Sequence, residues 1–527
     1  MFIRGLFLKT PMKRVLFIYP SSSPDLPNNE VDFSRYKSVP IGLLNIATYV
    51  KHLGYDISVI DGRAYSKAQV KDWVLEELQR PDLLAVCVSA TTIQLKHGLQ
   101  LCDMIKDKRK ELPIILGGIH PIMFPYQTIQ DSVVDYVVYG EGDYALRDIL
   151  LFIQNGEPKL EAIKGIMYKK QGKPYMTPVQ PGLDPNEFPD PDYELLEIEK
   201  YIEREFITNL GKAHKMRAMD IMTSRGCPYR CNFCTNTMDV FKRYRPLALE
   251  RVFGLIDKVV TKYNVNHIWF SDDLFFVHKK RLQDIANYII QKGYRLTWES
   301  NARVDQFKDG FLDDELLALL KKSGCMALRM GMESGSNRVL DLMKKDSTAE
   351  DIVHAVEMCE KHSIIAIGNF ICGFPTETKE EVMETGRLIL KLKEISPNGM
   401  FFSPGVLRPY PGTEMYAMCK EYGFKEPQTL REWASQKEGN WFFVETKDLP
   451  WLTDPQWLEN FQIYFYVLTV YRTHKLLNQP MSIPWKIMGK IAEWRFERDQ
   501  WNMSFEPSIL LKVKKVLDGE MDRCRLF

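Results

Sequence analysis

The segment TSRGCPYRCNFCTNT, residues 223–237, contains three cysteines in the spacing C-x3-C-x2-C, namely Cys227, Cys231 and Cys234. The other seven cysteines are scattered along the chain, several of them inside apolar runs, as is typical of small buried residues in a reducing compartment. A close group of thiols in such a protein indicates metal or redox chemistry. Three thiolates are three of the four ligands that a [4Fe–4S] cluster needs, so one iron would stay free to bind another molecule.

Two other interpretations of the three cysteines remain open. A structural zinc site would need a fourth ligand, for which His214 is the only close candidate, and such a closed site would be inert. The grouping could also be incidental. The spacing favours the cluster with one open iron over both.

Composition limits the class of protein and its partners. The chain has 527 residues, 45% of them apolar and 26% charged, with a formal net charge of +1. This length predicts two to four domains, on a prior of about 150 residues per domain, and the charge gives no electrostatic case for a nucleic-acid partner. We expect no transmembrane helix, because no apolar run reaches about 18 residues. A cytoplasmic location follows as a prediction.

Strands and helices alternate on both sides of the cysteine segment. Residues 216–430 contain six apolar strands separated by helices, which predicts a (β/α)6-type partial TIM barrel with active residues at the carboxyl ends of its strands. The cysteines directly follow the first of these strands, AMDIMTS. Residues 13–150 show the same alternation and predict a doubly wound domain, whose ligand should lie outside the carboxyl ends of a parallel sheet. The predicted fold class is therefore α/β.

The remaining parts of the chain are less regular. Residues 151–215, rich in Pro, Asp and Glu, are predicted to be a linker. Residues 431–527 are predicted to form a mostly helical C-terminal domain rich in aromatic residues. An aromatic stripe at helical spacing is usually core. Covering of the substrate and contact with a membrane surface are the alternatives.

The segment CPYRCNFC, with aromatic Phe233 before its third cysteine, resembles the cluster loop of the radical S-adenosylmethionine (SAM) enzymes. The resemblance implies that Cys227, Cys231 and Cys234 hold a [4Fe–4S] cluster whose free iron chelates the amino and carboxylate groups of SAM. It also implies that one electron cleaves SAM to methionine and a 5′-deoxyadenosyl radical, which takes hydrogen from the substrate. An electron donor such as flavodoxin or ferredoxin is then expected as a partner.

Later strand ends extend this resemblance and supply candidate SAM-binding residues. The segment WFSDDLF, residues 269–275, offers Asp272 or Asp273 for the methionine amino group, with helix capping as the alternative role. The other candidates are Glu299, Ser300 and Arg303 for the ribose and carboxylate, Glu333 beside Gly331 and Gly335, and Ile371, Gly373 and Glu377 for the adenine. Any one of them could equally be a cap or a surface ion pair, so the prediction depends on the joint pattern.

The first domain resembles the cobalamin-binding module of the methylase-type, or class B, radical SAM enzymes. The resemblance is carried in order by VPIGLLNIATYVKHLGYDISVID, VCVSATT, LGGIHPIMFP and VVYGEGDYAL. It implies that the cobalamin tail lies in a slot near Ser89, Thr91, Gly117, Gly118, His120 and Glu141. The chain lacks Asp-x-His-x-x-Gly, so we expect no histidine ligand on cobalt. A vestigial domain and a site for another nucleotide are the alternatives.

Together these features predict a cobalamin-dependent radical SAM methyltransferase that acts on an unactivated carbon, or a phosphinate phosphorus, of a small or lipid-like substrate. The alternative is a radical oxidative cyclase or rearrangement enzyme of the magnesium-protoporphyrin ester cyclase type, because residues 494–507 weakly resemble that branch. A metal-stabilised binding module is the non-enzymatic interpretation.

Overall fold

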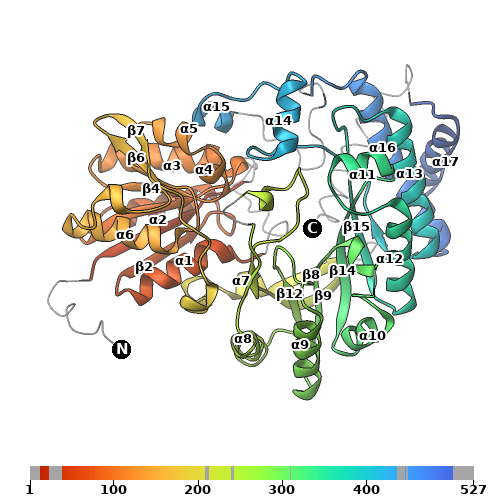
Figure 1. Ribbon diagram of the computed structural model, residues 1–527, viewed down its shortest axis with the longest axis horizontal. Helices are drawn as coiled ribbons and strands as arrows, with labels where there is room; N and C mark the ends of the chain where they lie inside the picture. The colour runs from red at the N-terminus through yellow and green to blue at the C-terminus, as the bar shows by residue number, and fades with distance from the viewer. Residues whose placement is uncertain are drawn as a thin grey trace. The chain divides into compact units, whose positions relative to one another are not determined.

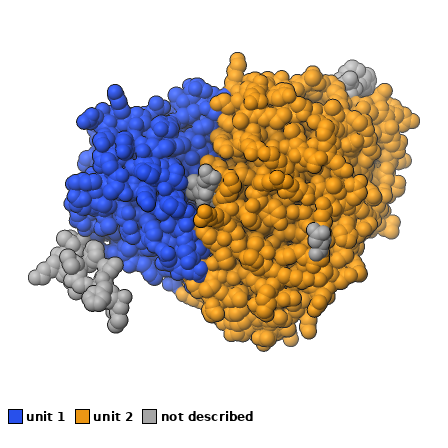
Figure 2. Space-filling model, viewed as in Figure 1, with its two compact units in different colours: residues 1–201, 426–438 blue, residues 202–425, 439–527 orange. Residues whose placement is uncertain are grey.

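The computed structural model describes residues 12–22, 38–207, 213–238, 242–308, 310–435, 446 and 449–501. The chain divides into two compact units, coloured separately in Figure 2. Unit 1 contains residues 1–201 and 426–438, and unit 2 contains residues 202–425 and 439–527. Both units are built on largely parallel sheets, as the alternation of strands and helices predicts, and an α/β fold is confirmed.

Unit 1 contains a seven-stranded sheet in the order β2-β1-β3-β4-β5-β6-β7 (Figure 1). Strands β1 to β5 are parallel, and the hairpin β6–β7 adds two antiparallel strands at one edge. The strands are β1 (Arg14–Tyr19), β2 (Asp56–Asp61), β3 (Leu83–Ser89), β4 (Ile114–Gly117), β5 (Tyr136–Val138), β6 (Ile166–Lys170) and β7 (Lys173–Met176). Its main helices are α1 (Ile41–His52), α2 (Lys67–Glu77), α3 (Leu95–Lys108), α4 (Ile119–Met123), α5 (Pro125–Gln130) and α6 (Gly142–Asn155).

Strand β1 shows why this sheet is covered on both faces. Its residues alternate between two separate hydrophobic cores, with Leu16 and Ile18 in one and Val15 and Phe17 in the other. A strand buried on both faces has the continuous apolar sequence that is typical of doubly wound folds. The strand order reverses at β1, with β2 on one side of it and β3, β4 and β5 on the other. The β1–β3 pair is therefore the topological switch point, where doubly wound folds bind their ligands.

Unit 2 contains the predicted partial barrel. Its sheet has the order β16-β15-β14-β13-β12-β9-β8. The strand β17 pairs with the last residues of β15, after the part of β15 that pairs with β16. The strands are β8 (Glu203–Ile207), β9 (Ala213–Ile221), β12 (His267–Phe270), β13 (Thr297–Ala302), β14 (Cys325–Glu333), β15 (Ile365–Cys372), β16 (Met400–Phe401) and β17 (Gly405–Val406). The covering helices are α8 (Leu249–Lys262), α9 (Lys279–Gln291), α10 (Asp314–Lys322), α11 (Asn337–Leu342), α12 (Ala349–Lys361), α13 (Lys379–Ile395) and α14 (Glu414–Glu421). All neighbours are parallel except β8, which runs antiparallel to β9.

The helices α16 (Pro455–Leu476) and α17 (Ile483–Arg498) belong to unit 2. The aromatic stripe of α16 is core: Trp457 stacks on Phe461 with ring centroids 5.5 Å apart, and Phe461 stacks on Phe465 at 5.1 Å. Trp501, only 1% exposed, packs edge-on against Phe461. These rings therefore stabilise the unit and do not form an open surface for a substrate. Residues of the 494–507 segment beyond 501 lie outside the described part of the chain.

Helix α15 (Leu430–Ser435) departs from the expected domain order, because it follows the barrel in sequence but packs in unit 1 beside α3 (Figure 1). Arg431 forms ion pairs with Asp103 at 2.8 Å and with Asp131 at 2.7 Å. Two carboxylates on one guanidinium hold the helix there, and Leu430 joins the core of unit 1. The four-part division of the chain predicted from sequence otherwise stays a prediction. No helix in the described residues has the length and apolar character needed to cross a membrane.

Lys393 on α13 is a buried cation, with 5% of its surface exposed. Its ammonium donates to Thr473 Oγ1 at 3.0 Å, and among the described residues it has no carboxylate partner. Burial lowers the pKa of Lys393 to about 8. At neutral pH the lysine is still charged, and burial of that charge destabilises the folded state.

We expect Lys393→Met to raise the free energy of unfolding at pH 7, by up to about 3 kcal/mol, since a shift of one pKa unit corresponds to about 1.4 kcal/mol. Between pH 8 and pH 10.5 the unfolded chain keeps a proton that the folded chain has released, so this lysine makes wild-type stability rise with pH in that window. The variant should lack the rise. Urea unfolding at pH 7 and pH 10 measures both effects, with the exposed Lys391→Met on the same helix as control. Equal pH dependence in both variants would contradict this assignment.

Candidate functional site

The cysteine loop follows β9 and the short strand β10 (Ser224–Arg225) in unit 2. Cys231 is buried, and Cys227 and Cys234 are half-buried. Asn232 fixes the loop, because its backbone N–H donates to Met343 O at 3.1 Å and its side-chain amide donates to Leu342 O at 2.6 Å. The loop is therefore held against the turn that follows β14 and α11.

The three thiols of this loop fit the ligand set of an iron–sulfur cube. Among the described residues, no three His, Cys, Asp or Glu side chains converge as they would on a single ion. A [4Fe–4S] cube does not require that convergence, because each thiolate binds a different iron. The side chain of His214, the fourth ligand that a zinc site would need, lies outside the described residues.

Burial disfavours free thiolates at Cys227 and Cys234. It raises the pKa of Cys234 to about 11 and also raises that of Cys227. Two nearby cations act in the opposite direction: Lys345 on Cys234 and Arg303 on Cys227. Arg303, predicted to bind the ribose or carboxylate of SAM, donates from Nη1 to Cys231 Sγ at 2.9 Å, and its role toward SAM stays a prediction.

The two adjacent aspartates after β12 have different surroundings. Asp272 is fully buried, and its carboxylate accepts hydrogen bonds from the backbone and hydroxyl of Thr223 and from the hydroxyl of Ser224. Burial raises the pKa of Asp272 to about 6. Asp273 is exposed and accepts from Gly226 N at 3.1 Å, directly before the first cysteine. Asp272 therefore ties the end of β9 to β12, and Asp273 is the more accessible carboxylate of the two.

The residues Glu299 and Ser300 of β13 are both engaged within the barrel. Glu299 is 6% exposed and accepts two hydrogen bonds of 3.2 Å from Arg329 on β14. Burial alone would raise the pKa of Glu299, but the charge of Arg329 and the neighbouring His267 lower it to about 2. The fully buried hydroxyl of Ser300 donates to Phe270 O at 2.8 Å on β12. Both side chains are thus engaged by protein groups.

Glu333 ends β14 in a strained conformation, with φ +63° at a bulge in the pairing with β15. Its carboxylate accepts from Lys345 Nζ at 2.8 Å, and both side chains are 7% exposed. A Cβ atom at Gly331 would lie 2.0 Å from Glu333 Oε1 and 2.9 Å from that Nζ, so glycine makes room for the ion pair. Strain of this kind is concentrated at functional sites.

The residues predicted to contact adenine lie at the end of β15. Ile371 and Phe233 of the cysteine loop both pack against one hydrophobic cluster. Gly373 has φ +78°, and its N–H and that of Phe374 donate to one carboxylate oxygen of Glu377. Burial raises the pKa of Glu377 to about 8, against the effect of these two hydrogen bonds. Glu377 thus shapes the turn that contains Gly373.

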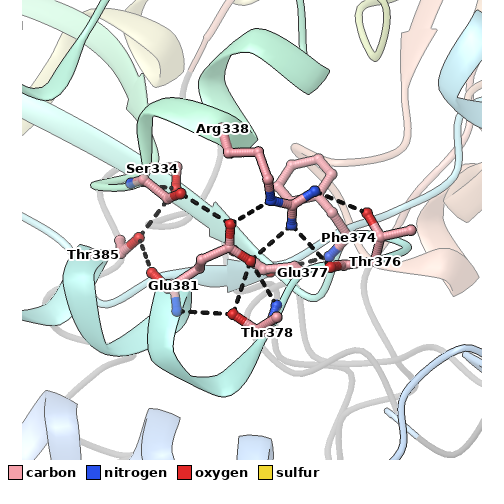
Figure 3. A network of polar contacts seen from close by, with 9 residues as sticks. Ser334, Arg338, Phe374, Thr376, Glu377, Thr378, Glu381 and Thr385 are labelled. Carbon is pink, nitrogen blue, oxygen red and sulfur yellow. Dashed lines mark hydrogen bonds and ion pairs between the residues drawn. The ribbon is translucent and has the colours of Figure 1, made fainter.

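A second network holds the next residues of this turn (Figure 3). Arg338 on α11 donates to both carboxylate oxygens of Glu381, at 2.6 and 2.7 Å, and to Thr376 O at 2.8 Å. Thr378 caps α13 by accepting from Glu381 N at 3.3 Å, and the Glu381 carboxylate accepts from the hydroxyl and N–H of Thr378. The end of β15 is therefore rigid, although Thr376 has φ +71°.

Three side chains that the sequence analysis did not single out also belong to this region. Asn301, between two candidates on β13, is half-buried and donates to Asp272 O at 3.3 Å. Asn369 is exposed although it lies within β15, and Trp269 Nε1 on β12 is buried without a partner among the described residues. The period of two along a strand could have found them, because it places alternate residues on the inner face.

In unit 1, the loop after β3 closes on the loop after β4. Gly118 has φ +95°, and a Cβ there would lie 2.7 and 2.8 Å from the backbone N and O of Ala90 and 2.9 Å from Ser89 Oγ. The nearest atom to such a Cβ at Gly117 is 4.0 Å away, so that position is more open. Thr91 is engaged locally, since its N–H and hydroxyl both donate to Gln94 Oε1 at 2.9 Å. Only a residue without a side chain allows this approach at position 118.

Two residues predicted to lie near the cobalamin tail are engaged by neighbouring groups of unit 1, and their part in cofactor binding stays a prediction. His120 is 0% exposed, its Nδ1 lies 3.0 Å from Thr92 Oγ1, and its ring packs against Phe124 and Trp433 of α15. Burial lowers the pKa of His120 to about 3, so the imidazole is neutral. Glu141 accepts from Leu183 N at 2.6 Å and thereby holds the following segment. Sequence alone could not show that α15 returns to cover the histidine.

The fold and site define an enzyme built from a cluster-binding barrel and a doubly wound cofactor domain. The family models agree: residues 221–389 match the radical SAM superfamily, and residues 33–150 match the B12 binding domain. An uncharacterised methyltransferase of Pyrococcus horikoshii is 30% identical over 385 residues, 72% of this chain and 77% of the relative. The anaerobic magnesium-protoporphyrin IX monomethyl ester cyclase of Rubrivivax gelatinosus is 26% identical over 406 residues, 74% of this chain and 68% of the relative.

Solved structures show the same fold. OxsB, a cobalamin-dependent SAM radical enzyme solved with aqua-cobalamin, superposes with a TM-score of 0.64 at 17% identity, over 97% of this chain and 76% of its own. TsrM from Kitasatospora setae, a radical SAM methyltransferase, superposes with a TM-score of 0.61 at 17% identity, over 78% of this chain and 77% of its own. The chain therefore belongs to the cobalamin-binding radical SAM enzymes. The cofactors of the family are a [4Fe–4S] cluster, SAM and cobalamin.

The adjacent aspartates supply a matched pair of variants. We expect Asp273→Asn to weaken SAM binding about tenfold or more, since a hydrogen bond to a charged group contributes about 1.5–3 kcal/mol, and to leave the melting temperature unchanged. Asp272→Asn should instead lower the melting temperature, because it disturbs three buried hydrogen bonds. Equilibrium dialysis against SAM and thermal unfolding separate the two effects. The reverse pattern would show that Asp272 is the SAM ligand.

The burial of His120 predicts that it does not ligate cobalt. The absorption spectrum of aquacobalamin bound to His120→Phe should match that of the wild type, and the amount bound per chain should be similar. A changed spectrum on substitution would show that the imidazole does reach the metal.

Proposed function

We propose that this chain methylates an unactivated carbon, or a phosphinate phosphorus, of a small or lipid-like molecule. The observation that carries the proposal is the presence, in one chain, of a cysteine loop that leaves a cluster iron open and of a B12 binding domain. Methyltransferase relatives support it: besides the archaeal one, the cytidylyl-2-hydroxyethylphosphonate methyltransferase of Streptomyces wedmorensis is 23% identical over 476 residues. When bound, the cluster supplies the electron that cleaves SAM, and cobalamin supplies a transferable methyl group.

The protein's own groups would bind and orient these partners. Cys227, Cys231 and Cys234 would hold the cluster, and Asp273 would accept hydrogen bonds from the SAM ammonium. The turn at Gly373, which the Glu377 carboxylate stabilises, would place backbone groups against the adenine. An electron donor of the flavodoxin or ferredoxin type would act from outside the chain.

The substrate would bind on the inner face of the barrel sheet. Trp269 has a buried N–H without a partner among the described residues, and Asn369 is exposed within a strand. An unpaired buried donor is costly, so a ligand with a hydrogen-bond acceptor would stabilise it. The ion pair of Glu299 and Arg329 lies on neighbouring strands of the same sheet. These groups favour a substrate that carries polar atoms near its reacting carbon.

A second candidate function is oxidative cyclisation without net methylation. It is favoured by the identity of 26% to the anaerobic ester cyclase over 74% of this chain. Both functions would use the same cysteines and the same SAM site, so the site residues do not separate them. The product does.

The test is an anaerobic incubation of reconstituted full chain with methyl-labelled SAM, aquacobalamin, titanium citrate and a metabolite extract from cells that lack the gene. We expect label in a new product detected by mass spectrometry, together with 5′-deoxyadenosine. The Cys234→Ala variant should form neither. 5′-Deoxyadenosine with an unlabelled new product would support cyclisation instead. Neither product, with zinc found by metal analysis, would support a binding module and overturn the proposal.

A further inference from the structure

Arg303 connects the cysteine loop to the turn after α11. Its Nη1 donates to Cys231 Sγ at 2.9 Å, and its Nη2 donates to the backbone carbonyl of Lys345. Lys345 Nζ lies 5.8 Å from the centre of the Phe233 ring, which belongs to the same loop. Of the three cluster cysteines, Cys231 is the most buried and is the one that the guanidinium contacts.

The guanidinium is held in place by two further groups. It lies over the ring of Tyr229 at 3.7 Å, and its Nε donates to Asp305 Oδ1 at 2.8 Å. The side chains of Arg303 and Asp305 are 8% and 15% exposed, so water screens this pair only weakly. The guanidinium of Arg303 is thus buried, contacts Tyr229, Asp305 and Lys345 O, and donates to the Cys231 sulfur, which distinguishes it from a surface ion pair.

Hydrogen bonds to cluster sulfurs and local charge set the reduction potential of iron–sulfur clusters. Reduction adds one electron to the cluster from an external low-potential donor, and no bond forms or breaks. The added negative charge is stabilised by a nearby cation and destabilised by a nearby anion. Arg303 and Asp305 should therefore act in opposite directions.

We propose that Arg303 is a positioning residue that raises the reduction potential of the cluster through its N–H···S contact with Cys231, and that Asp305 limits this effect. In this assignment the pair sets how readily the electron needed for SAM cleavage enters the cluster. The proposal rests on the proposed function only in that the cysteine loop holds a [4Fe–4S] cluster.

The test is a redox titration of the anaerobically reconstituted full chain without SAM, followed by electron paramagnetic resonance. Arg303→Gln should lower the equilibrium constant for one-electron reduction about tenfold, which is a shift of about 59 mV to more negative potential. Arg303→Lys keeps the charge and should shift less in the same direction. Asp305→Asn should shift the potential the opposite way, several-fold in the equilibrium constant. Lys393→Met, which removes another buried cation of unit 2 with different partners, should leave the potential unchanged.

Unchanged potentials in both Arg303 variants, or a negative shift in Asp305→Asn, would overturn the proposal. If Arg303→Gln fails to retain the cluster, Arg303→Lys and Asp305→Asn still decide it. Failure of the proposed function is distinguishable, because a wild-type chain without about four irons would lack the signal altogether.

Discussion

The parallel pairing of the barrel strands is the constraint on which the candidate site depends. Parallel strands bring their carboxyl ends to one edge of a sheet, so residues far apart in sequence become neighbours. The loops that follow β9, β12, β13, β14 and β15 all begin at this edge. Asp272 strengthens the arrangement, because its buried carboxylate joins the end of β12 to the residues that precede the cysteine loop. Without this tie the loop would lose its fixed base.

The polar residues near the site have two separate roles. The carboxylates of Asp272 and Glu381 accept hydrogen bonds from protein donors, and the Ser300 hydroxyl donates to Phe270 O, so all three hold strands and turns together. Asp273 and Asn369 are exposed, so these two side chains are accessible from solvent. A buried polar group whose hydrogen bonds are all satisfied usually stabilises the fold. An exposed polar group at a strand end is a candidate for binding a ligand. Neighbouring residues of like chemistry can thus differ completely in function.

Helix α15 shows how a segment can belong to a unit far from it in sequence. Arg431 meets two carboxylates of unit 1, and Trp433 covers His120 while donating to Gln127 Oε1 at 2.8 Å. The imidazole is thereby kept in an apolar environment and neutral. A histidine at a strand end would otherwise be read as a ligand, and the covering helix is what changes that interpretation.

The sequence by itself determined the α/β class, the two parallel sheets and the cysteine loop, because strand periodicity and thiol spacing are local properties of the chain. It also predicted WFSDDLF as a site segment, but could not show which of Asp272 and Asp273 is buried. Only the tertiary structure decided which carboxylate is buried, that Arg303 faces Cys231, and that the α16 aromatics are core. The physical reason is that burial, pKa and hydrogen-bond partners depend on contacts between distant segments, such as the 72 positions that separate Cys231 from Arg303.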